Sequence, residues 1–501
     1  MTTAPVGAEI RPSTGQRQVI IAALLFAAAL VLCGEALSAS AAPPRAVVWG
    51  ALALACYAFG LVCLAQAAES AGFGFTAWKF GPWVLLWYGL AYGLATVTWN
   101  GTQISVAREI AVPSVLRALW LVAVGITFWT VGYFVGPGRP IRRLAARGMT
   151  AMGRLLSGTV RSRLSPWLLY AIGTAARFAS TATTGRFGYA GNPSTALTAA
   201  TGYGQILSGL SLLAPLAIAA AALQVYREQI HAARITLVIL FMTELAFGAA
   251  AGGKGSFVIA VLAVVIPMCA ARHRLPKAMV IGAILAFLAI VLPFNQAYRS
   301  AVRGGPTILS PSEALQKAPL ILSQTFTGHS LMTVLPDSVT YLLQRMREID
   351  NPAIILQRTP GQIAFSSPGQ LILAPLGGIV PRAVWAGKPI LATGYEFSQQ
   401  YYDIPSTIYT SSAITPVGDL YRHGGWIPVI AGMFLLGCWV RLLDDTLDIR
   451  ANPHSIFLIL LLFPTLVTSE EDWVSFVAGI PANILIWLLA VALTFRYRRS
   501  A

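Results

Sequence analysis

Long apolar runs separated by short polar connections make up most of this 501-residue chain. Most runs have about 17–25 residues, the length that a helix needs to cross the hydrocarbon core of a bilayer. Because backbone groups in hydrocarbon must hydrogen-bond within their own segment, we expect these runs to be helices. Hydropathy predicts about twelve spans. Their approximate cores are residues 19–40, 46–67, 81–98, 113–135, 166–183, 205–225, 235–251, 255–271, 278–294, 425–443, 455–468 and 474–495.

The composition supports the same class of protein. Hydrophobic residues make up 56% of the chain and charged residues only 11%, and the mean hydropathy is +0.68. A soluble domain carries about 25% charged residues. The alternating pattern of outer-membrane barrel strands is absent from the sequence. We therefore predict an all-α polytopic membrane protein.

Basic residues gather in alternate connections between the expected spans. The connection 137–166 holds seven arginines and no acidic residue, and the turn 272–277 and the C-terminal end are also basic. Positive charges favour the cytoplasmic side, so both termini and these connections are expected there. The protein is then a multi-pass protein of the cytoplasmic (inner) membrane. Its net charge of +16 follows from this topology and does not call for nucleic acid as a partner.

The first apolar run allows a second interpretation. The small residues from Ser38 to Ala42 resemble the cleavage site of a signal peptide. A retained helix is favoured because the run is long for a signal peptide. The even number of spans also requires it.

One long polar segment interrupts the pattern. We divide the chain into a bundle of about nine helices at 1–294, an extracytoplasmic segment at 295–424 and the last three spans at 425–501. Long loops are exempt from the positive-inside rule, so the arginines of this segment are compatible with an outer location. Its apolar stretches, 319–322 and 371–380, predict short or re-entrant helices.

Motifs for metal ions, nucleotides and disulfides are absent from the sequence. The five cysteines all fall in expected spans without the spacing of metal ligands, and no histidine belongs to an HExxH motif. The chain has no Walker A loop and no GxGxxG motif. We expect neither a metal ion nor an organic cofactor.

The segment that precedes the apolar run near Trp426 combines cations with acids. Arg382 and Lys388 flank a tryptophan in PRAVWAGKP, and Asp419 follows in TPVGDLYRHGGW. Fixed cations can hold phosphate, and a carboxylate can accept a proton. The segment therefore suits an enzyme that handles lipid-linked phosphates at a membrane surface.

These motifs resemble those of the oligosaccharide repeat-unit polymerases, the Wzy-type O-antigen polymerases. PRAVWAGKP is similar to their PR-x-x-W-x-x-KP signature. TPVGDLYRHGGWIPVIAGMFLLG is similar to their acidic-Leu-Tyr segment and the following apolar helix. Weaker similarities occur in TGRFGYAG at 184–191, GGKGS at 252–256 and FNQAYR ending at Arg299. The clear resemblance covers about 65 residues at 379–443.

The resemblance implies a transfer reaction between lipid-linked glycans. A glycan on polyprenyl diphosphate would be transferred to a sugar hydroxyl on a second polyprenyl-diphosphate-linked repeat unit. A chain-length regulator or a flippase would be a possible partner. Cations would neutralise the leaving diphosphate, and an acid would accept the hydroxyl proton. The candidate residues for binding diphosphate or substrate are Arg382, Lys388, Arg299, Arg177, Lys254, Tyr421 and Arg422, and those for catalysis are Asp419, Glu470 and Glu244.

Several of these candidates also have structural interpretations. Arg177 falls inside an expected span and could reach the interface, and Glu244 could pair with it or with Lys254. A short helical hairpin needs a glycine-rich turn whether or not it binds an anion. The acidic residues 470–472 could form a hydrated turn between spans.

Two other functions remain open at this point. An O-antigen ligase would share the membrane bundle and an arginine-rich outer segment. A transporter or flippase of lipid-linked glycans also suits about twelve spans, although such proteins generally contain related halves and this sequence shows no internal repeat.

Overall fold

The structure is a computed structural model that describes most of the chain. The described residues are 14–39, 43–70, 78–101, 109–191, 203–303, 308–327, 331–373, 385, 393–406, 408, 410–449, 452–468 and 470–497. Helices dominate these residues, and the two named strands are short. The expected all-α polytopic class is confirmed.

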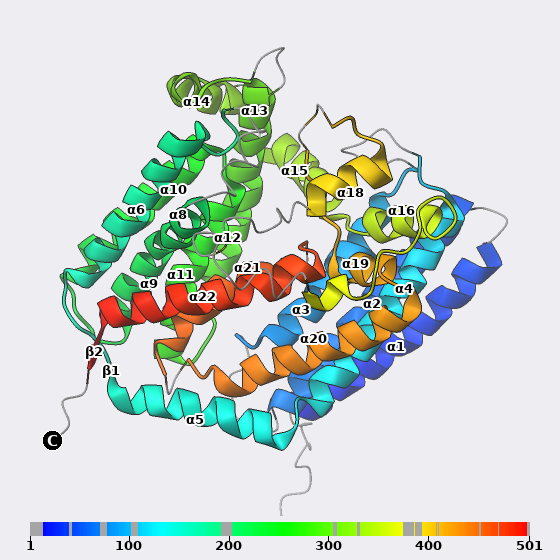
Figure 1. The fold of residues 1–501 in the computed structure, drawn as a ribbon, viewed down its shortest axis with the longest axis horizontal. Coiled ribbons are helices and arrows are strands. Elements are labelled where there is room, and N and C mark those ends of the chain that lie inside the picture. Colours follow the sequence, from blue (N-terminus) through cyan, green and yellow to red (C-terminus); the bar gives the residue numbers. More distant parts are fainter. Residues whose placement is uncertain are drawn as a thin grey trace, which may run out of the picture.

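The first group of helices comes mainly from the N-terminal part of the chain and lies on one side of the bundle (Figure 1). It consists of α1 (Thr14–Ser38), α2 (Pro43–Ser70), α3 (Phe80–Tyr88) with its extensions η2 (Gly89–Gly93) and η3 (Leu94–Thr98), α4 (Val112–Val135) and α20 (Trp426–Thr446). Helices α4 and α20 touch through glycines. A Cβ atom on Gly132 would lie 2.0 Å from the Phe434 carbonyl oxygen, and one on Gly437 would lie 1.9 Å from that of Trp129. Such small residues allow membrane helices to approach closely.

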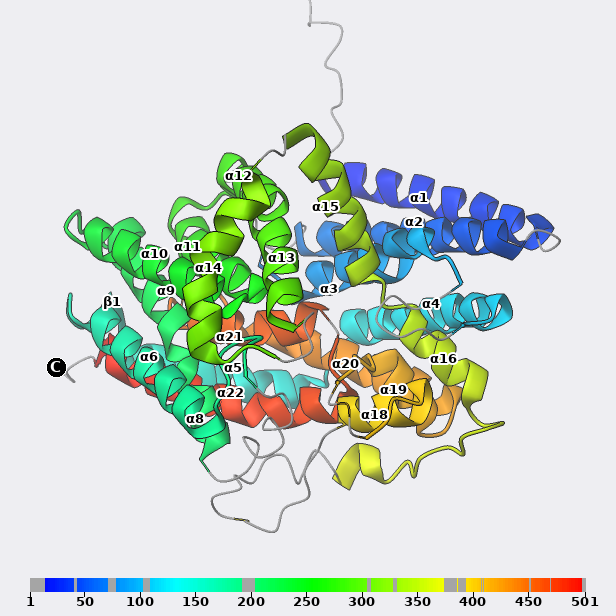
Figure 2. The same cartoon turned by 90° about the horizontal axis from the view of Figure 1, so that it is seen from above.

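The second group surrounds α9, whose residues are almost all buried. It consists of α6 (Ser165–Thr184), α8 (Gly204–Ser211), α9 (Leu213–Tyr226), α10 (Ala233–Ala251), α11 (Lys254–Arg272), α12 (Lys277–Ala286), η4 (Phe287–Val291) and α13 (Leu292–Arg303). Of the two C-terminal helices, α21 (Ser455–Thr468) contacts α3 of the first group and α9 and α11 of the second, whereas α22 (Trp473–Thr494) packs against α21, α6, α8 and α9 (Figure 2).

The two ends of the bundle carry different elements (Figure 1). At one end lie α5 (Arg139–Leu155) and the antiparallel pair β1 (Leu156–Val160) and β2 (Phe495–Tyr497). At the opposite end, the long polar segment folds into short helices. These are α14 (Pro311–Phe326), α15 (Leu331–Met346), α16 (Asp350–Arg358), α18 (Thr393–Tyr402) and α19 (Pro416–Arg422).

Each of the twelve expected spans coincides with helical structure, although the helices differ in length. Among the described residues, nine helices are long and apolar enough to cross a membrane. The expected spans at 166–183, 455–468 and 474–495 correspond to α6, α21 and α22, which do not belong to these nine. A polytopic membrane protein is therefore supported, and the count of twelve stays a prediction.

Candidate functional site

Three arginines line one open cavity at the α13 end of the molecule. Arg299 and Arg303 lie one turn apart on α13, and Arg186 follows α6. The cavity has a volume of about 340 Å³, and Gly188, Tyr189, Thr410 and Ser411 complete its lining. We call it the arginine pocket. Its walls come from the connection after α6, the end of α13 and the stretch before α19.

The connection after α6 is fixed by a tight backbone turn. Phe187 and Ala190 exchange two backbone hydrogen bonds of 3.1 and 3.0 Å. Gly188, inside this turn, has a φ of +58°, and a Cβ atom there would lie 1.8 Å from the Ala251 carbonyl oxygen. Only glycine fits this close approach in a left-handed conformation. The turn therefore holds Tyr189 against the end of α10.

Tyr189 organises the two arginines of α13. The guanidinium carbons of Arg299 and Arg303 lie 5.6 and 5.1 Å from the centre of its ring. These are cation–π distances. Arg303 Nε also donates a 3.1 Å hydrogen bond to the Tyr189 carbonyl oxygen. The tyrosine thus holds both cations at the wall of the pocket.

The pocket carries positive charge that the described residues do not neutralise. None of Arg186, Arg299 and Arg303 forms an ion pair with a carboxylate in the part of the chain that the structure describes. Arg186 Nε is buried without a hydrogen-bond partner there. Like charges held together repel, and a bound anion would remove this repulsion.

An apolar groove lies next to the arginine pocket. Its volume is about 350 Å³, and its lining comes mainly from apolar residues of α10, α11, η4, α13 and α14. Gly252 has a φ of +68°, ends α10 and belongs to the groove wall. A Cβ atom on Gly252 would lie 2.9 Å from the Tyr189 ring, so this glycine separates the groove from the arginine pocket. Lys254, at the start of α11, also lines the groove. It is the one cation among the lining residues that the structure describes.

A second polar site surrounds Asp419, which is fully buried on α19. Its Oδ1 accepts a 2.6 Å hydrogen bond from Arg422 Nε, and its Oδ2 accepts a 3.0 Å hydrogen bond from the Trp473 backbone N–H. Burial raises the pKa of this carboxyl, and the Arg422 charge opposes the rise. Asp419 therefore ties α19 to the start of α22.

The comparisons with known proteins place the chain in a family. A family model described as "Domain of unknown function (DUF8712)" matches residues 190–448, which is more than half of the chain. The chain belongs to this family. No curated protein and no solved structure matches it. The region shared with other DUF8712 members contains Lys254, Arg299, Arg303 and Asp419 and begins just after Arg186 and Tyr189.

The structure of this DUF8712 protein brings two of the predicted phosphate ligands near one another. Arg299 lies in the arginine pocket and Lys254 lies in the adjacent groove. The sequence alone did not point to Arg186 or Arg303 as candidates, although Arg186 lies within the motif TGRFGYAG. Arg382 and Lys388 lie outside the described residues. Trp385, between them in the sequence, is exposed.

Arg177 and Glu244, two further candidates, contact each other. Two hydrogen bonds of 2.7 Å join the Arg177 guanidinium to the Glu244 carboxylate, and the arginine also lies 4.7 Å from the centre of the Phe247 ring. This arrangement matches the structural interpretation of the pair. We therefore leave both residues out of the proposed site.

The remaining candidates are divided between exposed and buried positions. Glu470 is exposed, whereas Arg422 is buried and forms an ion pair with Asp419. Tyr421 packs edge-on against Phe365 and Trp426, with ring centres 6.0 and 6.3 Å away. The contacts of Tyr421 and Arg422 are thus with neighbouring protein side chains.

Glu348 is a buried carboxyl that sequence reasoning missed. It lies between α15 and α16, and its Oε2 accepts a 2.9 Å hydrogen bond from Asn351, whose own Oδ1 accepts one from Tyr402. Burial raises the pKa of Glu348 well above its usual value, and the nearby Glu470 charge raises it further. The folded protein therefore binds the Glu348 proton more tightly than a solvated glutamate would. Its sequence context, RMREID, resembles a solvated charge run and gives no sign of burial.

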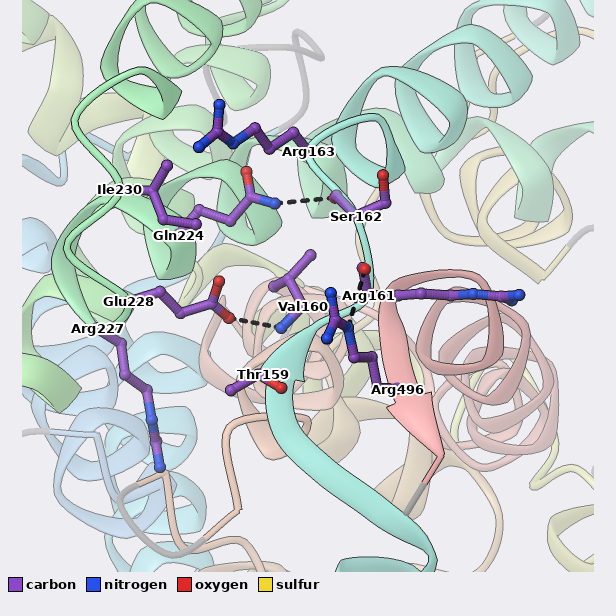
Figure 3. Close-up of a pocket in the computed structure, with 10 residues that line it drawn as sticks. All are labelled: Thr159, Val160, Arg161, Ser162, Arg163, Gln224, Arg227, Glu228, Ile230 and Arg496. Carbon is purple, nitrogen blue, oxygen red and sulfur yellow. Dashed lines mark hydrogen bonds between the residues drawn. The ribbon is translucent and has the colours of Figure 1, made fainter. Parts of the chain in front are cut away.

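The cavity of about 520 Å³ at the β1 end of the molecule has a different character (Figure 3). The side chains of Arg161, Arg163 and Arg227 extend in different directions around it. The Glu228 carboxylate accepts a 2.5 Å hydrogen bond from the Val160 backbone N–H and so holds β1 in place. We do not assign catalysis to this cavity.

Proposed function

We propose that this protein is a membrane glycosyltransferase that polymerises polyprenyl-diphosphate-linked oligosaccharide repeat units into a cell-surface polysaccharide. The observation that carries the proposal is the arginine pocket beside an apolar groove. The pocket suits a diphosphate, because arginine binds phosphate oxygens through paired hydrogen bonds. The groove suits part of a polyprenyl chain. The sequence resemblance to repeat-unit polymerases supports the same substrate class.

The pocket would act on the leaving group of the transfer. A hydroxyl oxygen of the acceptor glycan attacks the anomeric carbon of the donor, and the bond from that carbon to the diphosphate oxygen breaks. The bonding electrons leave with the diphosphate, whose charge Arg186, Arg299 and Arg303 would stabilise. Cationic side chains can do this without a metal ion.

The proton of the acceptor hydroxyl needs a carboxylate. Asp419 is held by Arg422 and Trp473, and Glu348 is buried and accepts a hydrogen bond from Asn351. Glu470 is exposed, and its charge acts on the nearby Glu348. We therefore assign the role of proton acceptor to Glu470, among the predicted acids.

The proposed orientation follows from the distribution of basic residues. About twelve spans with both termini in the cytoplasm place α5 and β1 inside and the arginine pocket on the extracytoplasmic face. The segment 295–424, with its short helices, is then the extracytoplasmic part of the protein. Lipid-linked repeats would be used on that face.

The alternatives differ in the fate of the lipid-linked glycan. A ligase-type enzyme would use the same diphosphate pocket but would transfer the glycan to an acceptor other than a second repeat unit. A transporter would bind the lipid-linked glycan in the pocket and release it unchanged.

The purified full-length protein, incubated with a lipid-linked repeat unit in the presence of EDTA, tests the proposal. We expect a ladder of products that grow by one repeat unit, together with released polyprenyl diphosphate. Binding of the lipid without any new glycosidic bond would contradict the polymerase and favour the transporter. Transfer only to an added acceptor of another class would favour the ligase.

A further inference from the structure

Helix α5 runs across one end of the bundle and is anchored at both of its ends (Figure 1). Near its start, Arg142 lies 3.6 Å from Asp445, close to the end of α20. Its last residue leads into β1, which pairs with β2 directly after α22. The helix thus connects the end of α20 with the end of α22.

The residues of α5 are divided among three faces. Met149 and Met152 pack against the hydrophobic core. Ile141 and Leu144 point away from it and are 53% and 72% exposed. Arg139, Arg143 and Arg147, each four residues from the next, are exposed on a separate stripe, because residues four apart share one face of a helix.

This division is typical of a helix that lies in the plane of a membrane surface. One face contacts the protein, the exposed apolar side chains enter the boundary of the acyl chains, and the arginines stay at the level of the head groups. The sequence of α5 contains no acidic residue. Asp445, near its start, is already paired with Arg441 and Arg142.

We propose that α5 is an in-plane docking surface for anionic phospholipid head groups of the leaflet at its end of the molecule. The occupant follows from charge complementarity. Three exposed guanidinium groups attract phosphate, and the neighbouring Ile141 and Leu144 suit an acyl chain attached to that phosphate. Arg161 and Arg496, which are exposed, lie beside β1, the strand that directly follows α5 (Figure 3). The inference does not depend on the proposed enzymatic function.

The test measures lipid preference in the full-length protein. The protein is reconstituted into phosphatidylcholine vesicles with spin-labelled phosphatidylglycerol or spin-labelled phosphatidylcholine as the probe. The ratio of their association constants gives the preference for the anionic lipid. One basic residue near an anionic membrane surface contributes about fivefold to binding. We therefore expect the variant Arg139→Gln/Arg143→Gln/Arg147→Gln to lower this preference by at least about fivefold. Added salt should weaken the wild-type preference.

Two control variants keep the test specific. Replacing the same three arginines by lysine preserves the charge and should keep the preference within about twofold. The variant Arg272→Gln/Arg274→Gln/Lys277→Gln removes three exposed charges from another turn and should lose much less than the α5 variant. An unchanged preference in the glutamine variant of α5 would overturn the proposal. An equal loss in the lysine variant or in the control turn would overturn it as well.

Discussion

Arg177 on α6 and the buried Glu244 on α10 form an ion pair through two hydrogen bonds of 2.7 Å. The pair joins two helices of the second group at a position where an unpaired charge would be costly. The sequence offered both Arg177 and Lys254 as partners for Glu244, and the structure selects Arg177, 67 positions away.

The pair predicts a stability effect that a double variant reverses. Arg177→Gln leaves the Glu244 charge buried without a partner, so we expect a loss of about 3–5 kcal/mol in the free energy of unfolding. Arg177→Gln/Glu244→Gln should recover most of it. Thermal unfolding of the purified protein in detergent measures both variants. If Arg177→Gln unfolds like the wild type but forms no polymer, Arg177 is a substrate ligand after all.

Glu348 predicts a pH-dependent difference in stability. Burial raises its pKa above the ordinary value of 4.5, so the folded state binds the proton more tightly than the unfolded state. Its contribution to stability is therefore complete below pH 4.5 and decreases as the pH rises toward the folded-state pKa. Glu348→Gln keeps a neutral side chain that can accept the Asn351 hydrogen bond.

The expected result is a Glu348→Gln variant that melts at or above the wild-type temperature at pH 8 and approaches the wild type near pH 5. The matched control is Glu313→Gln, which changes an exposed acid of the same polar segment. A Glu348→Gln variant that melts well below the wild type at pH 8 would show that the carboxylate is ionised in the folded protein.

The proposed orientation predicts which residues an impermeant thiol reagent reaches in intact cells. Ser312 is exposed at the start of α14, and a Cβ atom on Gly148 of α5 would meet no other atom within 4 Å. We expect Ser312→Cys to be labelled from outside and Gly148→Cys only after the membrane is permeabilised. The unsubstituted protein reports the background from its own cysteines. The opposite pattern would invert the topology.

The sequence predicted the parts of this fold that depend on local pattern. Apolar runs located the helices, and GGKGS located the turn that ends α10, because Gly252 adopts a left-handed conformation. Arg299 was selected because it ends FNQAYR, a short motif that resembles one of the repeat-unit polymerases. These features depend on neighbouring residues, so one sequence is enough to find them.

The arginine pocket could not be predicted in the same way. Arg186 and Arg303 are 117 positions apart in the sequence, and Tyr189 brings them together through a ring contact and a backbone hydrogen bond to Arg303. Glu348 was missed for a related reason, because its burial depends on packing between α15, α16 and the distant Ala91. Contacts of this kind become visible only in three dimensions.

Arg299 offers the most direct test of the central claim, that the arginine pocket binds the diphosphate of a lipid-linked glycan during transfer. Arg299→Gln removes a pocket charge that forms no described ion pair, so folding should be little affected. Loss of its transition-state contact should slow polymer formation by about 10²–10³. Arg299→Lys should restore only part of the rate, because lysine keeps the charge but lacks the planar fork.

The measurement is the rate at which the purified protein forms the repeat-unit ladder, with Lys317→Gln as the matched control. Lys317 is an exposed cation at the same end of the molecule, outside the pocket. The account predicts a wild-type rate for Lys317→Gln and a rate lower by about two to three orders of magnitude for Arg299→Gln at equal amounts of folded protein. A wild-type ladder from Arg299→Gln would contradict the account.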